Sequence, residues 1–306
     1  MKGRLQKPRF IYIMMKVTVD AAAKINLFLD ITGTLENGYH SLFMVMQSVD
    51  LFDTVTLEKT ETGIIELTCS EPSLPCDRKN IAMRAAQAFF NDADIKNTGL
   101  RIHIEKKIPL AAGLAGGSAD AAAVICGLNA LYEAGLCETA LCSIGIKVGS
   151  DVPFCIAGGT RLVENIGEKM SFLPALRDCH IVLAKPERGV STAEAYAAYN
   201  ELENVNHPDG EAMLSAARAS DFEKMCEYAQ NVFEQVIDFP EFSSIRSCFE
   251  SNGASLVRMS GSGPTMFGIF TDDSSAQTAA AQLKSLKLNC RIHHCRPISD
   301  AIRIKA

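Results

Sequence analysis

The 306-residue sequence lacks three features that mark large classes of proteins. No apolar run is long enough to span a bilayer, because Asp, Gly or Asn interrupts the longest alanine-rich stretches. Basic residues are not in excess: the formal net charge is −6, which argues against a general nucleic-acid-binding surface. The eleven cysteines include no Cys-x-x-Cys pair, a pattern typical of reduced, buried thiols. We therefore expect a soluble, cytoplasmic protein with no membrane or nucleic-acid partner.

Length and composition predict two domains. A chain of this size with 47% hydrophobic residues can bury a substantial core. Strand patterns dominate the first third, and the second half mixes helices with strands, which indicates an α+β fold. We predict an N-terminal extension over residues 1–14, a first domain over 15–165 and a second over 166–306. Translation could begin at Met1, Met14 or Met15, and no signal-peptide cleavage site follows the early basic residues.

Alternation and turn residues locate the elements. In the first half, strands are predicted at Val17–Val19, Ile25–Ile31, Val45–Leu51, Thr54–Leu57, Ile64–Cys69, Leu100–Ile104 and Thr160–Glu164, with helices at Asn80–Asn91, Ser118–Ala134 and Glu138–Val148. In the second half, strands are predicted at His180–Ala184, Ser255–Met259, Thr265–Phe270 and Arg291–Cys295, with helices at Ala193–Glu201, Gly210–Ala219, Asp221–Asn231, Pro240–Glu250 and Ser274–Leu286.

A loop of glycines and small residues precedes the alanine-rich helix. Small residues let the backbone approach an anion, and the N-terminus of the following helix favours negative charge, so the loop is a candidate phosphate site. It has neither the Gly-Lys-Ser/Thr of a Walker loop nor the spacing of a dinucleotide fingerprint. Taken alone, it could equally be a turn that packs a helix closely on a sheet. Its residues are Pro109, Leu110, Ala111, Ala112, Gly113, Leu114, Ala115, Gly116, Gly117 and Ser118.

A lysine inside an apolar strand is the second unusual feature. Burying the ammonium group of Lys24 is costly unless it is paired, so we expect this side chain to face a site. Asn26 lies two residues further on and shares the same face of the strand. Tyr39 and His40 follow an Asn-Gly turn and, taken alone, are typical of a polar loop tip.

Two further segments indicate a function only when they are considered together with the other motifs. Asp151 precedes the apolar, proline-containing stretch Val152–Phe154, where it could equally cap or terminate a turn. The segment Met259–Thr265 places small residues between two predicted strands and, by itself, is a hairpin.

Together and in this order, these segments resemble the GHMP kinases. The resemblance extends over nearly the whole chain and rests on Ala23–Leu27, Asn37–His40, Pro109–Ala122, Ser150–Pro153 and Gly261–Gly263. It implies a two-domain fold, with an N-terminal ribosomal-protein-S5-like nucleotide domain and a C-terminal ferredoxin-like α/β plait. Many members have glycine at the positions of Ala111, Ala112 and Ala115, and commonly serine at Ala119. These replacements are small and still allow the loop to close on phosphate.

Within the family, the sequence most resembles members that use ATP and Mg²⁺ to phosphorylate the 2-hydroxyl of 4-diphosphocytidyl-2-C-methyl-D-erythritol, in the non-mevalonate isoprenoid pathway. The resemblance implies that Asp151 accepts the hydroxyl proton and that Lys24 is its catalytic partner. The glycine loop then binds the triphosphate. No cluster of metal-ligating residues is evident, so we expect Mg²⁺ to be held largely by nucleotide and water.

The same resemblance implies how the cytidine diphosphate derivative and the adenine are bound. Substrate contacts are assigned to Asn26, Tyr39, His40 and Tyr196, of which Tyr196 could equally be a core residue of a helix. Asn80 and Lys106 are candidates for the adenine pocket, but they could equally be a helix cap and a solvated strand-end charge.

Two other functions stay open at this point. Another GHMP kinase would act on homoserine, mevalonate or a sugar, and would have no obvious use for Lys24 or the Tyr39-His40 pair. A catalytically silent protein of the same fold would bind without turnover, although the presence of both Lys24 and Asp151 argues against it. We expect a monomer or a weak homodimer.

Overall fold

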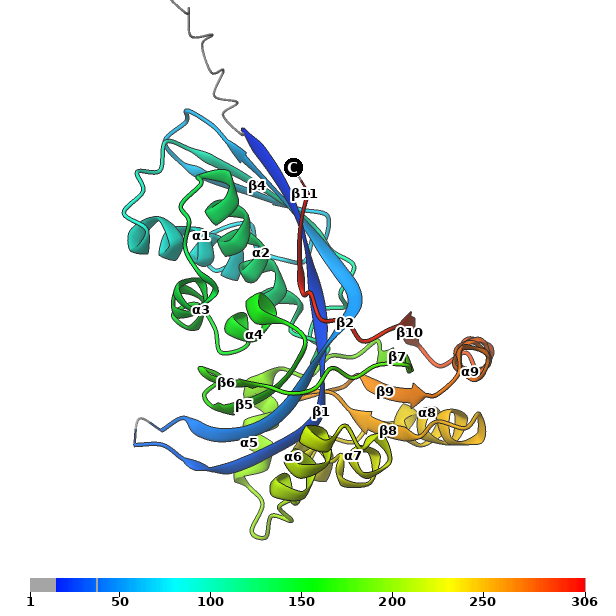
Figure 1. Ribbon diagram of the computed structural model, residues 1–306. Helices are drawn as coiled ribbons and strands as arrows, with labels where there is room; N and C mark the ends of the chain where they lie inside the picture. The colour runs from blue at the N-terminus through cyan, green and yellow to red at the C-terminus, as the bar shows by residue number, and fades with distance from the viewer. Residues whose placement is uncertain (1–14, 37, 306) are drawn as a thin grey trace, which may run out of the picture.

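The computed structural model describes residues 15–36 and 38–305. The predicted extension over residues 1–14, with the alternative starts at Met1 and Met14, lies outside the described residues, as does Asn37. Two sheets form the framework, and the long strands β1 and β2 run through the height of the molecule past both helical regions (Figure 1).

The first sheet contains seven strands within the described residues, in the order β11-β1-β2-β4-β3, with β5 paired to β2 and β6 to β5. All pairs are antiparallel except β3 with β4. The strands are β1 (Lys16–Thr34), β2 (His40–Lys59), β3 (Ile65–Cys69), β4 (Leu100–Glu105), β5 (Thr160–Asn165), β6 (Lys169–Phe172) and β11 (Ile302–Lys305).

Strands β1 and β2 are each longer than predicted. The predicted strands Val17–Val19 and Ile25–Ile31 are two parts of β1, and Val45–Leu51 and Thr54–Leu57 are two parts of β2. The register of β1 shifts between Ala22 and Ala23 and again beyond Asn26. Such bulges break the strict alternation that strand prediction requires while the ladder continues, so the prediction of separate strands was wrong.

Four helices cover one face of this sheet: α1 (Ile81–Asp92), α2 (Gly116–Leu131), α3 (Glu138–Ile146) and α4 (Val152–Ala157) (Figure 1). Helix α2 is buried on nearly all sides, which explains its alanine-rich sequence. At Gly127 an added Cβ would lie 2.6 Å from Leu57 Cδ1, so this glycine lets the helix lie directly on the sheet. Helix α4 was missed because Pro153 resembles a turn signal, whereas it occupies the first turn of a helix, where proline is tolerated.

The second sheet has four antiparallel strands in the order β10-β7-β9-β8. Its strands are β7 (His180–Pro186), β8 (Leu256–Met259), β9 (Met266–Phe270) and β10 (Cys290–Cys295). Helices lie between β7 and β8 and between β9 and β10, which gives the βαββαβ arrangement of a ferredoxin-like plait. The chain then returns to the first sheet through β11, a strand that was not predicted from the sequence.

The remaining helices are α5 (Thr192–Asn200), α6 (Gly210–Ala219), α7 (Phe222–Tyr228), the short 3₁₀ helix η1 (Val232–Gln235), α8 (Pro240–Ser251) and α9 (Asp273–Ser285). Of these, α5, η1, α8 and α9 pack in the second hydrophobic cluster, whereas α6 and α7 contribute to the first. Over the described residues, no helix combines the length and apolarity needed to cross a membrane. The division at residues 165 and 166 stays a prediction, since β6 and β11 follow it in sequence but belong to the first sheet.

Candidate active site

A cavity of about 720 Å³ is lined by segments from both halves of the chain. Every residue from Pro109 to Ser118 lines it, and so do Asn80 and Lys106. Lys24 and Asp151 also line the cavity, and Tyr196 of α5 lines it from the second half of the chain. The structure therefore brings most of the sequence-predicted site residues around one space.

The glycine loop opens this cavity toward the N-terminus of α2. Ala115 holds the N-cap position in the left-handed region, at φ 57°, and no side chain in the described part of the chain caps the helix. The first-turn N–H groups have no partner within the helix, so they are available to an anion. Ala111 also has a positive φ, at 46°. Left-handed backbone favours glycine over alanine, so both positions are ones where glycine would be accommodated more easily.

The loop is docked onto the hairpin of the second sheet. The hydroxyl of Ser260 donates to the carbonyl of Gly113 at 3.0 Å, and the backbone N–H of Lys24 donates to the carbonyl of Leu114 at 3.2 Å. Gly113 has φ +70°, and an added Cβ would lie 2.0 Å from the Ser260 carbonyl oxygen. Only glycine fits this contact.

We expect Gly113→Ala to separate the loop from the hairpin. The new Cβ clashes with backbone that has no side-chain freedom to yield, so the variant should lose about 2 kcal/mol or more of unfolding free energy and most of its ATP turnover. Ala115→Gly is the matched control, because it relieves a left-handed alanine in the same loop and should keep activity. Urea unfolding and ADP release measure both; equal behaviour of the two variants would contradict this docking.

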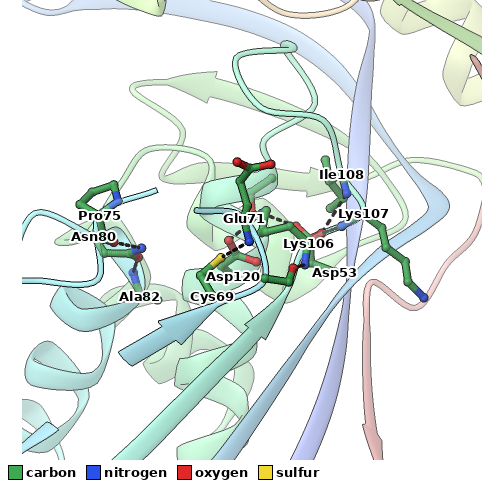
Figure 2. Close-up of polar contacts among 12 residues, drawn as sticks. Asp53, Cys69, Glu71, Pro75, Asn80, Ala82, Lys106, Lys107, Ile108 and Asp120 are labelled. Atoms are coloured by element: carbon green, nitrogen blue, oxygen red, sulfur yellow. Dashed lines mark hydrogen bonds and ion pairs between the residues drawn. The ribbon is translucent and has the colours of Figure 1, made fainter. Parts of the chain in front are cut away.

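Behind the loop lies a buried ionic cluster, drawn in Figure 2. Lys106 Nζ contacts Asp53 Oδ2 and lies 2.7 Å from Asp120 Oδ2, and each of the three side chains is at most 4% exposed. Asp53 Oδ1 also accepts the backbone N–H groups of Lys107, at 2.6 Å, and Ile108, at 2.9 Å. The cluster thus joins the end of β4 to β2 and α2, and it fixes where the glycine loop begins.

The cluster overturns one interpretation of Lys106 and adds two acidic residues to the site that the sequence did not predict. Lys106 as a solvated strand-end charge is wrong, because two carboxylates pair with it in the core. Asp53 and Asp120 were not predicted as site residues. A charged residue inside an apolar strand was the signal that singled out Lys24, and the same signal is present at Asp53 within β2.

Asp120 gives the cluster an expected pH dependence. Burial raises its pKa to about 8, with Asp53 adding to the increase and Lys106 opposing it. Because this pKa lies above the ordinary value of 3.8, the folded protein retains a proton that the unfolded chain releases. The stability contributed by this proton is complete below about pH 4 and is lost as the pH rises toward 8.

We expect Asp120→Asn to gain stability relative to the native protein as the pH rises from 5 to 8. The variant cannot ionise, so the difference should shift by at least about 1.4 kcal/mol, the equivalent of one pKa unit. Urea unfolding at both pH values measures it. A difference that does not change with pH would contradict the raised pKa.

Lys24 forms the other charged group of the cavity. Its Nζ donates to Asn26 Oδ1 at 2.6 Å and lies 3.7 Å from Asp151 Oδ2. The Lys24 side chain is 5% exposed, whereas that of Asp151 is 31% exposed. Asp151 stands at the N-cap position of α4, but its carboxylate makes no capping bond to the described backbone. The capping alternative is therefore wrong, and the carboxylate is left facing the lysine and the cavity.

Asn26 lies behind this pair rather than in the cavity. Its side chain is almost fully buried, its amide nitrogen contacts Met44 Sδ at 3.4 Å, and its backbone N–H donates to Ser260 Oγ at 3.3 Å. Asn26 thus holds the Lys24 ammonium in place and connects β1 to the hairpin.

Two aromatic rings, those of Tyr196 and Phe233, form an aromatic wall of the cavity, whereas the predicted substrate contacts His40 and Tyr39 do not line it. The imidazole of His40 lies flat on the ring of Tyr196, with centroids 4.9 Å apart and planes 3° from parallel. Phe233 packs edge-on against Tyr196 at 5.1 Å and fixes its orientation. Burial, with the nearby Asp151 charge, raises the pKa of Tyr196 to about 12, so the phenol stays neutral. Tyr39, beside His40, is 64% exposed.

Asn80 serves as the helix cap that the sequence allowed. Its Oδ1 accepts from the backbone N–H of Ala82 at 2.9 Å, and its Nδ2 donates to the carbonyl of Pro75 at 2.8 Å (Figure 2). It also lines the cavity, so capping and a place in the adenine pocket are compatible.

Comparison with known proteins agrees with this geometry. The GHMP kinases N terminal domain matches residues 80–159, and the GHMP kinases C terminal domain matches residues 213–287. A 4-diphosphocytidyl-2-C-methyl-D-erythritol kinase from Exiguobacterium sibiricum is 45% identical over 86% of this chain and 92% of its own length. A protein of the same name from Clostridium botulinum is 41% identical over 88% of this chain and 96% of its own.

Solved structures show the same relationship. The crystal structure of a 4-(cytidine 5'-diphospho)-2C-methyl-D-erythritol kinase aligns with a TM-score of 0.72 at 30% identity, covering 91% of this chain and 98% of its own. A homoserine kinase from Cytophaga hutchinsonii aligns with a TM-score of 0.79 over 98% of this chain, but its 17% identity shows the fold alone. The chain belongs to the two-domain GHMP kinases and, within them, to the family of the 4-diphosphocytidyl-2-C-methyl-D-erythritol kinases.

Proposed function

We propose that this kinase transfers the γ-phosphoryl group of ATP to the 2-hydroxyl of 4-diphosphocytidyl-2-C-methyl-D-erythritol, giving the 2-phosphate and ADP for isoprenoid precursor synthesis. The observation that carries the proposal is the Lys24–Asp151 pair, at 3.7 Å, within the cavity that the glycine loop lines. Relatives at 41–45% identity with this activity in their names support the choice of acceptor.

The residues divide the chemistry between them. Phosphoryl transfer needs alignment and charge neutralisation more than a strong nucleophile. Asp151, the more exposed partner, orients the substrate hydroxyl and accepts its proton as the bond to phosphorus forms. Lys24 neutralises charge on the transferring group, and Asn26 keeps the ammonium in position. All these groups come from one chain, so the proposal requires no second copy.

The cavity fits a magnesium nucleotide. The uncapped N-terminus of α2 and the glycines beside it suit the triphosphate. Oxygen donors suited to Mg²⁺ line the same space: the Ser118 hydroxyl, the Asp151 carboxylate and Asp120, whose Oδ1 is buried and accepts no hydrogen bond from the described residues. When bound, Mg²⁺ would neutralise charge on the phosphate oxygens.

The aromatic wall suits a cytosine base. Tyr196 offers a ring face that Phe233 holds in place, and His40 carries a ring nitrogen, Nδ1, that is buried without a hydrogen-bond partner among the described residues. Because stacking contributes only about 0.5–1.5 kcal/mol beyond area burial, we assign base selectivity to His40 and stacking to Tyr196 with the exposed Tyr39. In this assignment, His40 turns from the face of Tyr196 when the base enters.

We expect the enzyme to require the cytidyl group, although that group is remote from the reacting hydroxyl. Binding it supplies free energy for aligning the alcohol, so 2-C-methylerythritol 4-phosphate should show kcat/KM lower by at least about 100-fold. His40→Ala should reduce this difference in kcat/KM, because it lowers kcat/KM only for the substrate that carries cytidine. His103→Ala on β4 should leave the difference unchanged. Coupled ADP release measures the constants.

The same assay tests the proposed function against its alternatives. Homoserine, mevalonate and galactose are the competing acceptors. Faster ADP release with any of them than with the cytidyl substrate would overturn the proposal. Nucleotide binding without turnover on any acceptor would identify a silent binding protein instead. Comparable kcat/KM values for the substrate with and without cytidine would leave the kinase intact but refute cytidine recognition.

A further inference from the structure

Two histidines and an aspartate meet on the second sheet, among residues that do not line the cavity. His180 is the first residue of β7, and His294 lies on the neighbouring strand β10. The register pairs His294 with Val182, so the two histidines are diagonal neighbours on one face of the sheet. Asp273 is the first residue of α9, which packs against both strands.

One carboxylate oxygen faces both imidazoles. Asp273 Oδ1 lies 2.9 Å from His180 Nδ1 and 3.5 Å from His294 Nε2, and the three atoms lie within 4.8 Å of one another. The other oxygen, Oδ2, accepts a hydrogen bond from the side-chain amide of Gln277, one turn along α9. Each ligand-type atom therefore points inward, and the carboxylate is oriented by a neighbour that does not share the site.

A buried nitrogen in this group lacks a hydrogen bond. His180 Nδ1 is shielded from solvent and, apart from its ion-pair contact with Asp273 Oδ1, has no hydrogen bond to a described residue. Buried polar atoms are nearly always hydrogen-bonded, so a buried nitrogen without a hydrogen bond calls for a further partner. A metal ion would provide it.

We infer that His180, Asp273 and His294 bind a divalent transition-metal ion of the Zn²⁺ type. Bonds of about 2.0–2.2 Å at tetrahedral angles place neighbouring ligand atoms about 3.3 Å apart, between the two nitrogen-to-oxygen distances observed. The His294 side chain is 29% exposed and can turn inward to complete the set. Two imidazoles exclude Mg²⁺, which prefers oxygen ligands, so this ion is distinct from that of the nucleotide.

The surroundings set the character of the site. Arg296 Nη2 lies 3.9 Å from Asp273 Oδ1, but its side chain is 64% exposed and free to swing into solvent when a cation binds. Three protein ligands leave a fourth position for water. The ion joins β7, α9 and β10, so it stabilises the second domain and takes no part in phosphoryl transfer.

The test is metal binding by untagged, full-length protein. With Zn²⁺ in calorimetry and Co²⁺ as a spectroscopic probe, we expect one ion per chain and a rise in Tm with Zn²⁺. His294→Ala and Asp273→Asn should weaken binding at least about tenfold and abolish the Tm shift. His103→Ala, which alters an exposed histidine of the other sheet near Glu105, is the control and should bind as the native protein does.

Three results would overturn the inference. They are the absence of Zn²⁺ and Co²⁺ binding to the native protein, unchanged binding in both variants, or a thiolate-to-cobalt charge-transfer band that assigns the ion to cysteines. His180→Ala removes a largely buried ring and can fail to fold, so the more exposed His294 and Asp273 carry the decision. Loss of metal binding in these two variants with normal kinase activity would support it.

Discussion

Asp151→Asn is expected to lower kcat by at least about 100-fold while leaving the fold and ATP binding nearly unchanged. The amide cannot accept the proton of the substrate hydroxyl, yet it occupies the same place at the start of α4. Lys24→Met should cause a similar loss, because it removes the cation 3.7 Å from Asp151. The loss of kcat in the double variant should be far smaller than the product of the two single fold-losses, since the two residues act as a unit.

Steady-state ADP release, with circular dichroism and nucleotide titration as checks of folding and binding, measures these variants. Asp92→Asn is the matched control, because it changes the carboxylate of a surface ion pair with Lys147. Near-normal turnover in folded Asp151→Asn would remove this residue from the chemistry. If the loss of kcat in the double variant equalled the product of the two single fold-losses, Lys24 and Asp151 would have separate roles.

Asp53→Ala is expected to cost about 3–5 kcal/mol of unfolding free energy, the usual cost of breaking a buried ion pair. The change leaves Lys106 with one carboxylate, and it leaves the N–H groups of Lys107 and Ile108 without their acceptor. Asp53→Asn keeps an acceptor oxygen and should lose less. Because these N–H groups begin the glycine loop, KM for ATP should rise in both variants.

Glu58→Ala is the matched control on the same strand. Its ion pair with Arg101 is exposed, so its loss should cost about 1 kcal/mol or less. Urea unfolding of the three variants gives the comparison. If Asp53→Ala were no more destabilising than Glu58→Ala, the buried cluster would not be what holds the loop.

The order of motifs in the sequence was enough to predict the family and the two-domain α+β fold. Lys24 stood out because an ammonium group in an apolar strand needs a partner, and Asp151 stood out through its motif. Most helices were recognised from their periodicity and caps, as at Asn80. Helix α4 and the strands β6 and β11 were missed, because a proline in a first turn and strands of four residues carry little local signal.

The tertiary structure decided how distant residues meet. Nothing local to Gly113 reveals that its Cα hydrogens face the carbonyl of Ser260, and nothing local to Lys106 reveals that Asp53 and Asp120 pair with it. The sequence by itself determined which residues are chemically capable, because residue type and spacing set local conformation and charge. Which of them share the cavity, which lie behind it and which gather around His180 depended on packing between elements far apart in the chain, since burial and distance are properties of the fold.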